Sequence, residues 1–259
     1  MENNVLGPIA TLDSSLLAGR DYEEFLSVRE REEFSRFRTP LRKSEWLAGR
    51  LSSKFLFLSE QSGTLSAADL VRFPPSMYRN TEVVRNDSVR FGLPQVGSGD
   101  EFRDVAISHT NGIACALLGQ GETIAVDMER VEPRTPVFYR GNFTERERAW
   151  SAGCSRRLVL DPHWTLTLLW SMKECLLKTP AYNGLSVWDM PSLDLRIISG
   201  EDDLVHPPSA REFSGTFVFL SVEATRRSCT VSHRVAVSGR YDLVVTAIRE
   251  VDRRTVWAL

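Results

Sequence analysis

Two short stretches of the sequence carry carboxylates whose spacing could support metal chemistry. In residues 123–129 apolar and polar positions alternate as in a β-strand, so that Asp127 and Glu129 point to the same face. Later in the chain, Glu174 and Lys178 have the spacing of one helical turn. Carboxylate oxygens are the ligands that Mg²⁺ prefers, with waters and substrate phosphates completing an octahedron. Asp127, Glu129 and Glu174 are therefore candidate ligands of Mg²⁺, with Mn²⁺ as an alternative.

Each stretch also has an interpretation without chemistry. Glu174 and Lys178 would make an ordinary ion pair on a solvated helix face. Asp127 and Glu129 would mark a strand end that faces water. The residue types and their spacing leave both interpretations open.

The elements that must position these carboxylates follow from the periodicity of apolar residues. Helices are expected at 21–37, 41–60, 143–152 and 163–179. Strands are expected at 7–12, 102–109, 113–118, 122–129, 192–198, 215–224, 229–237 and 241–248, with turns at Asn111–Gly112 and Gln120–Gly121. The stretch 65–99 is predicted to be loop with short extended pieces, and 130–140 an extended linker.

Two of the predicted helices carry further polar groups of interest. The helix at 41–60 places Lys43, Arg50 and Lys54 close together, either as a solvated basic face or as a site for a phosphate-bearing ligand. In the helix at 143–152, Thr144 and Glu147 have the spacing of a capping box.

The two carboxylate stretches resemble the paired signatures of the Sfp-type 4′-phosphopantetheinyl transferases, G-[IV]-D-x-E and W-[ST]-x-K-E-x-x-x-K. Here they read AVDME at 125–129 and WSMKECLLK at 170–178, with Ala125 in place of the usual glycine. Three further stretches resemble family motifs in the same order. They are the R-x-x-E-[YFW]-L-A-G-R helix at 42–50, the S-H-[ST] motif at 108–110 and the F-[ST]-x-x-E stretch at 143–147.

The resemblance implies an α+β fold made of two similar halves, packed as a pseudo-dimer within one chain. The boundary would fall near Gly121. Residues 1–120 would then form an N-terminal half that contacts the phosphate and adenosine end of coenzyme A. Residues 121–259 would form a C-terminal half that carries the metal site.

The resemblance also implies a reaction. The 4′-phosphopantetheine arm of coenzyme A would pass to a serine of an apo acyl or peptidyl carrier protein, and 3′,5′-ADP would leave. Mg²⁺ on Asp127, Glu129 and Glu174 would grip the pyrophosphate, with Lys178 beside it and Lys173 as an alternative partner for that charge. The residues implied for the far end of the coenzyme are Ser108, His109, Arg50 and either Arg42 or Lys43.

The carrier serine needs a base, and Glu147 and Glu174 are the candidates. A cation lowers the pKa of its own ligand, so Glu147 is preferred. A capping role for Glu147 is the alternative. Where family members carry a G-[KR]-P motif, Leu93 replaces the basic residue, and either Arg90 compensates or that contact is missing.

The carrier protein's surface is expected near the metal site, because carrier proteins are typically acidic around the modified serine. The linker 130–140 and the next helix, with Arg146, Arg148 and Trp150, could supply it, or the linker could simply be solvated. A non-catalytic module that binds a carrier protein or a coenzyme is the alternative function. An unrelated Mg²⁺-dependent phosphotransferase is disfavoured, because the G-x-x-x-x-G-K-[ST] loop is absent.

The composition sets outer limits on function. A formal net charge of −2 over 259 residues argues against bulk nucleic-acid binding. No apolar run approaches the roughly 20 residues of a membrane span, and the first ten residues lack the pattern of a signal peptide. The cysteines show no C-x-x-C spacing. We therefore expect a cytoplasmic monomer without zinc or a disulfide framework.

Overall fold

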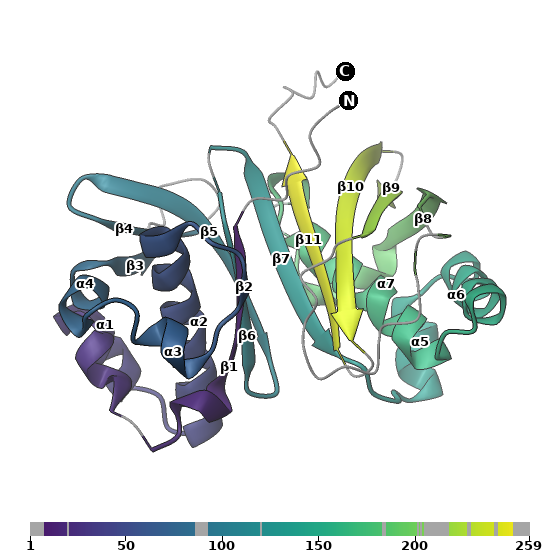
Figure 1. The fold of residues 1–259 in the computed structure, drawn as a ribbon. Coiled ribbons are helices and arrows are strands. Elements are labelled where there is room, and N and C mark those ends of the chain that lie inside the picture. The colour runs from purple at the N-terminus through teal and green to yellow at the C-terminus, as the bar shows by residue number, and fades with distance from the viewer. Residues whose placement is uncertain are drawn as a thin grey trace.

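A computed structural model of the 259-residue chain describes residues 8–19, 21–85, 93–119, 121–182, 185–200, 202, 204, 218–226, 229–240 and 243–250. These residues form a mixed α+β fold with two β-sheets, as the sequence predicts. The sheets lie beside each other in the middle of the molecule, and the helices lie on their outer sides (Figure 1). No helix in the described ranges has the length and apolar character needed to cross a membrane.

The first sheet is built from residues before position 119, with strand order β2-β1-β6-β5-β4-β3. Its strands are β1 (Ile9–Asp13), β2 (Gly63–Thr64), β3 (Glu82–Arg85), β4 (Pro94–Ser98), β5 (Glu101–Thr110) and β6 (Ile113–Leu118). The helices of this half are α1 (Val28–Ser35), α2 (Pro40–Ser59), α3 (Ala67–Leu70) and α4 (Pro75–Asn80), with 3₁₀ turns η1 (Ser14–Leu17) and η2 (Tyr22–Phe25).

Helix α2 covers the outer face of the first sheet. It starts sharply because Thr39 caps the Arg42 N–H and Pro40 needs no hydrogen-bond acceptor at the first helical position. It ends at Glu60, which takes a left-handed φ of 53°. Successive side chains of β6 point to opposite faces of the first sheet and so belong to two different apolar cores. Ala114, Ala116 and Leu118 pack under α2, whereas Cys115 and Leu117 face the second sheet.

A buried ion pair ties α2 to the rest of this half. Lys54 is fully buried and donates hydrogen bonds to Glu30 Oε2 and to the carbonyl oxygens of Phe25 and Tyr78, the last two at 3.0 and 2.9 Å. Glu30 is the third residue of α1 and forms a capping box with Ser27. Its other oxygen accepts a hydrogen bond from the Val83 N–H of β3 at 3.1 Å.

The second sheet follows position 122 and has strand order β7-β11-β10-β9-β8 with antiparallel neighbours. Its strands are β7 (Thr123–Arg130), β8 (Leu193–Ser199), β9 (Val218–Arg226), β10 (Cys229–Arg240) and β11 (Leu243–Glu250). Its helices are α5 (Pro136–Asn142), α6 (Glu145–Leu158) and α7 (Pro162–Leu177), with 3₁₀ turns η4 (Pro180–Tyr182) and η5 (Val187–Ser192).

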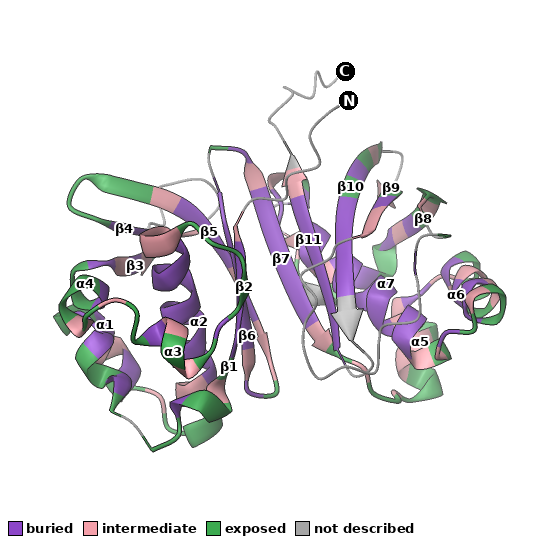
Figure 2. Cartoon of the chain, viewed as in Figure 1, coloured by how far each residue is buried: buried purple, intermediate pink, exposed green. Residues whose placement is uncertain are grey.

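The inner faces of the two sheets share one apolar cluster. The first sheet contributes Ile9, Ala106, Cys115 and Leu117. The second sheet contributes Ile124, Val126, Met128, Ala236, Leu243, Val245 and Ala247. Figure 2 shows that the strands are mainly buried and that exposed residues gather on the helices and loops outside them. The site described below lies where β5 of one half meets β7 of the other.

Several sequence expectations need correction at the level of elements. The region 21–37 is not one helix but η2 followed by α1, and 65–99 contains the short helices α3 and α4. The predicted linker 130–140 ends in α5, because Thr135 caps a helix that starts at Pro136. The predicted boundary at Gly121 lies between β6 and β7, where the chain passes from one sheet to the other. Gly7, Arg90, Gln120 and residues 215–217 of the predicted strand 215–224 lie outside the described residues.

Candidate metal and substrate site

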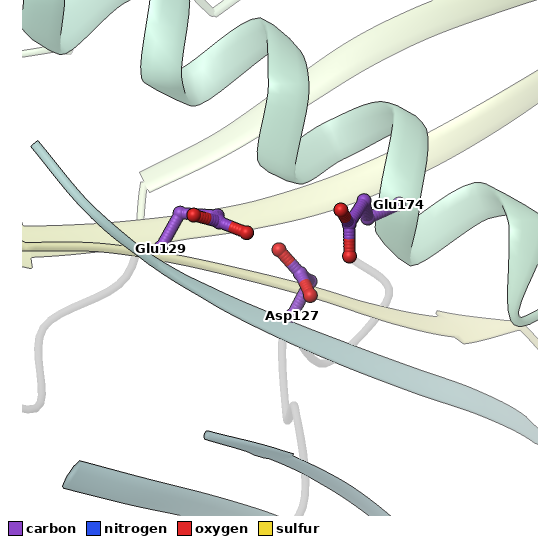
Figure 3. A group of neighbouring side chains, drawn as sticks. All are labelled: Asp127, Glu129 and Glu174. Carbon is purple, nitrogen blue, oxygen red and sulfur yellow. The ribbon is translucent and has the colours of Figure 1, made fainter. Parts of the chain in front are cut away.

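Strand β7 and helix α7 bring three carboxylates together. Ile124, Val126 and Met128 face the first sheet, so the alternating residues Asp127 and Glu129 face α7. From each side chain of the set Asp127, Glu129 and Glu174, one ligand oxygen lies within 4.8 Å of the others. Figure 3 shows the three carboxylates directed toward one another from the strand and the helix. The structure therefore assembles all three residues that the sequence predicts as metal ligands.

Asp127 is the most buried member of this carboxylate trio. Its Oδ1 accepts hydrogen bonds from Lys178 Nζ at 2.8 Å and from the Ser108 hydroxyl at 3.2 Å. Its Oδ2 is buried and has no hydrogen-bond partner among the described residues. A buried carboxylate oxygen without a donor is costly, and a bound cation would remove that cost. This orphaned oxygen, together with an all-oxygen donor set, fits a hard divalent cation such as Mg²⁺.

Glu129 is held at both of its oxygens. The indole Nε1 of Trp170 donates to Oε1 at 3.3 Å, and Arg134 Nη2 lies 3.1 Å from Oε2. The Arg134 guanidinium in turn lies over the rings of Phe138 and Trp170, at 4.9 and 5.8 Å from their centroids. The sequence analysis did not identify Arg134. Its only signal was an arginine shortly after the D-x-E strand, beside Pro133.

The crowding of carboxylates changes their affinity for protons. Burial, and then the negative charge of Asp127, raise the pKa of Glu129 to about 7. The same two causes raise the pKa of Glu174 to about 7, against the opposing effects of Lys178, Arg134 and Trp170. Without a cation, Glu129 and Glu174 therefore hold protons near neutral pH, and a bound cation would displace them.

Lys178 and Ser108 connect the trio to the first half of the molecule. Lys178 Nζ also donates to the Val126 carbonyl at 3.0 Å and to the Ser108 hydroxyl at 3.4 Å. Burial alone would lower the pKa of Lys178, but the ion pair and hydrogen bond with Asp127 outweigh it and raise the pKa. Ser108 was expected to contact a phosphate. In this structure its hydroxyl bridges Asp127 and the Met128 N–H and so aligns β5 with β7 at the site, and its contact with a phosphate stays a prediction.

His109, the next residue on β5, meets the start of α2. Arg42 Nη1 donates to His109 Nε2 at 2.6 Å, and Glu45 Oε2 lies 3.4 Å from His109 Nδ1. Burial lowers the pKa of His109, and the neighbouring cations reinforce this effect against Glu45. The imidazole is therefore neutral, with Nε2 as the acceptor. The structure brings together Arg42 and His109, which the resemblance places at the far end of the coenzyme.

The expected basic face on α2 is not an open anion site. Arg50 is buried, with its guanidinium over the Trp46 ring at 4.5 Å and against Glu33 at 3.4 Å. Lys43 lies over the Phe34 ring at 5.0 Å. Lys54 belongs to the buried pair described above. The Arg50 guanidinium is thus enclosed beside Glu33 and Trp46 rather than open to a ligand, and its contact with a coenzyme phosphate stays a prediction.

Glu147 and Lys173 are also directed inward. The Lys173 ammonium donates to Glu147 Oε2 at 2.9 Å, and neither side chain has exposed surface. The Glu147 carboxylate also accepts hydrogen bonds from the N–H groups of Thr144 at 2.8 Å and Leu195 at 2.7 Å. The predicted capping box is confirmed. Both side chains are enclosed and fully paired in this structure, and the roles of Glu147 as a base and of Lys173 as a phosphate partner stay predictions.

Two of the arginines expected to contact the carrier protein are engaged in contacts within this protein. Arg146 is paired with Asp194 at 2.8 Å, and Arg148 donates to the Phe143 carbonyl. Helix α5 instead presents Val137, whose side chain is 71% exposed, beside the exposed Arg140. Leu93 lies just before β4. Its suggested substitute, Arg90, lies outside the described residues.

Part of the chain matches a protein-family model. Residues 123–238 match the family model described as the 4′-phosphopantetheinyl transferase superfamily. This range starts at the first residue of β7 and contains all three carboxylates and Lys178. No curated protein matches this chain.

Proposed function

We propose that this protein transfers 4′-phosphopantetheine from coenzyme A to a carrier protein, because residues 123–238 match the family model of the 4′-phosphopantetheinyl transferase superfamily. The acceptor is a serine hydroxyl of an apo acyl or peptidyl carrier protein, and 3′,5′-ADP leaves. The observation that carries the proposal is the carboxylate trio, with ligand oxygens within 4.8 Å and one buried oxygen of Asp127 lacking a partner among the described residues.

Asp127, Glu129 and Glu174 would hold the divalent cation, Mg²⁺ or Mn²⁺. When bound, the cation supplies Lewis-acid polarisation of the pyrophosphate oxygens. Lys178 keeps its positive charge at neutral pH, because its pKa is raised. Its ammonium therefore stabilises the negative charge that grows on the leaving phosphate.

The serine proton goes to a carboxylate that solvent can reach. Glu147 is enclosed, so Glu174 is the carboxylate to which we now assign this role. Glu174 would then be both a cation ligand and the proton acceptor. A bound cation lowers the pKa of Glu174, which makes it a weaker base.

A direct test is mass spectrometry of an apo carrier protein incubated with this chain, coenzyme A and Mg²⁺. The carrier should gain one phosphopantetheine group per modified serine. Asp127→Ala and Glu129→Ala should each lower the rate by about 10² or more while the fold is kept. If the wild-type chain binds coenzyme A but never modifies a carrier, the alternative of a non-catalytic binding module is favoured instead.

The far end of the coenzyme gives a second prediction. We place its 3′-phosphate against Arg42 and His109, so Arg42→Ala and His109→Ala should weaken binding of coenzyme A more than of dephospho-coenzyme A. A lost hydrogen bond to a charged group costs about 1.5–3 kcal/mol. Titration calorimetry with both ligands measures the difference. Arg50→Ala is the control that should lower stability without this selectivity, and equal losses for both ligands in all three variants would contradict the placement.

We place the carrier protein against α5. This helix adjoins the site, because Phe138 packs on Trp170 at 4.9 Å between ring centroids. An exposed valine beside an arginine also suits a partner that is acidic around an apolar contact.

A further inference from the structure

The two halves contain the same buried lysine–glutamate pair, built from the same parts. In each half the glutamate is the third residue of a capped helix, and the lysine projects from the long helix that covers the sheet. The corresponding residues are Ser27 and Thr144 as caps, Glu30 and Glu147 as acids, and Lys54 and Lys173 as bases.

The remaining hydrogen bonds of the two pairs also correspond. Each ammonium donates to two backbone carbonyls, and each glutamate accepts from the backbone of an edge strand. The carbonyls are those of Phe25 and Tyr78 for Lys54, and of Asn142 and Met190 for Lys173. The edge-strand donors are Val83 of β3 and Leu195 of β8.

The residue that follows each lysine distinguishes the two halves. Phe55 follows Lys54 and packs in one apolar cluster with Leu12 of β1. Glu174 follows Lys173 and meets Asp127 of β7. The same buried lysine–glutamate pair therefore lies next to a residue of the apolar core in one half and next to a member of the carboxylate trio in the other.

We propose that Glu147 and Lys173 are positioning residues for the cation site. Lys173 joins α7 to the end of α5 through Asn142 and to η5 through Met190. Glu147 extends the same connection to α6 and β8. Five elements are thereby fixed around the residue next to Glu174. This inference rests on the proposed cation site, but not on the group that the protein transfers.

The remaining ligands do not depend on this pair in the same way. Asp127 and Glu129 lie on β7, whose register is set by its pairing with β11. Glu174 is the one member of the trio on a helix, so its distance from the others follows the placement of α7. Removing side chains that orient a metal ligand typically lowers metal affinity by about 10–100-fold.

The test is Mn²⁺ binding to the full-length protein, measured by electron paramagnetic resonance. Removing one partner of a buried pair leaves an unpaired charge, whereas replacing both with apolar residues can keep the fold. The variant is therefore the double replacement Glu147→Leu with Lys173→Met. Its matched control is Glu30→Leu with Lys54→Met, which removes the corresponding pair from the other half.

We expect the Glu147/Lys173 replacement to weaken Mn²⁺ binding by about tenfold or more. The Glu30/Lys54 replacement should change it by less than about twofold, although its thermal unfolding temperature should shift to a similar extent. Equal effects on Mn²⁺ binding from the two replacements would overturn the proposal. So would unchanged binding in the first, or a wild-type chain that does not bind Mn²⁺.

A second measurement separates positioning from proton transfer. In Glu147→Gln, a positioning role predicts a lower rate of carrier modification with the low-pH limb of the rate profile retained. A base at Glu147 predicts that this limb disappears. Loss of the limb in Glu147→Gln would therefore overturn the positioning role. Failure of all transfer in the wild-type chain would count against the proposed function and leave the Mn²⁺ comparison intact.

Discussion

At the scale of single residues, the carboxylates of the site differ in how many hydrogen-bond donors each of their oxygens has. Glu129 has a donor at each oxygen, whereas Asp127 has two donors on Oδ1 and none from the described residues on Oδ2. The two glutamates hold their protons up to a pH of about 7, because burial and Asp127 raise their pKa values. A cation held by these carboxylates, as proposed above, would therefore compete with protons.

The raised pKa values of Glu129 and Glu174 predict how the stability of the cation-free protein depends on pH. Between about 4.5 and 7, the folded cation-free protein keeps protons on Glu129 and Glu174 that the unfolded chain has released. Its free energy of unfolding should therefore fall as the pH rises through that window. Thermal unfolding at about pH 5 and pH 8 in a chelator should show a smaller fall for the double variant Glu129→Gln/Glu174→Gln than for wild type.

Mg²⁺ supplies the complementary measurement. Because protons compete with the cation, Mg²⁺ should raise the unfolding temperature more at about pH 8 than at about pH 5. Arg134→Gln should shift this Mg²⁺ response to higher pH, since Arg134 lowers the pKa of Glu129. Arg140→Gln removes the same charge from the exposed surface of α5 and is the control. A Mg²⁺ response that does not vary with pH would show that the carboxylates do not bind the ion.

The carboxylate trio could be predicted from the sequence because each of its residues lies in a stretch with clear strand or helix periodicity. Each of these two stretches also resembles one of a pair of motifs of the same family. The sequence did not show that Arg50, Lys173 and Glu147 are enclosed by neighbouring elements. Periodicity tells on which face of a helix a side chain lies, but not whether that face meets water or another element. Helix α7 is buried on nearly all sides, so a charge on it can be structural or catalytic with the same spacing.

At the scale of elements, the turn between β5 and β6 matters because it places His109 against α2. Asn111 and Gly112 both have positive φ, at 44° and 84°, as a two-residue hairpin turn requires. The Gly112 N–H donates to Glu45 Oε1 at 3.1 Å, and its carbonyl accepts from the Ser14 N–H at 2.7 Å. The turn is thus joined to both α2 and η1.

Gly112→Ala should be costly. An alanine there would keep a left-handed φ, and its Cβ would lie 3.0 Å from Ser14 Oγ. The left-handed conformation alone costs about 1–2 kcal/mol of stability. Gly99→Ala is the matched control, because Gly99 also has positive φ but no atom within 4 Å of the added Cβ. Chemical denaturation should show a larger loss for Gly112→Ala, and equal losses would mean that the contact with Ser14 is easily relieved.

The same scale shows which elements sequence can predict. Strands 113–118 and 122–129 were found nearly residue for residue, because their apolar residues serve two cores and leave little ambiguity. Helix α5 was missed, although Thr135 followed by Pro136 is a helix-start signal. A single short helix buries few residues of its own, so its composition resembles that of a linker.

At the scale of the whole molecule, the site needs both halves. Ser108 from the first half donates to Asp127 in the second, and Lys178 contacts both residues. The two sheets also bury one apolar cluster between them. The matched range 123–238 lacks β11, which lies between β7 and β10 in the second sheet. The matched range therefore does not contain the complete second sheet.

A fragment of residues 122–250 should accordingly behave poorly even though it includes the complete second sheet. It would expose the inner faces of β7, β10 and β11, and a contiguous apolar surface of this kind leads to association. We expect it to bind a hydrophobic dye and to aggregate, and to bind Mn²⁺ more weakly than the full chain. A soluble, monomeric fragment with full Mn²⁺ affinity would show that the first half is dispensable for the site.

The unequal use of the two halves has a consequence for how the sequence tolerates substitution. Leu12 and Phe55 need only fill volume, which several apolar side chains can do at small cost. In the proposed cation site, Asp127 and Glu174 would each have to present an oxygen ligand at a fixed point. A saturation survey of all positions, selected for activity, should find the two halves equally strict at Lys54 and Lys173. At the next position of each helix the survey should find different tolerance. Several apolar residues should replace Phe55 without loss of activity, whereas no residue should replace Glu174.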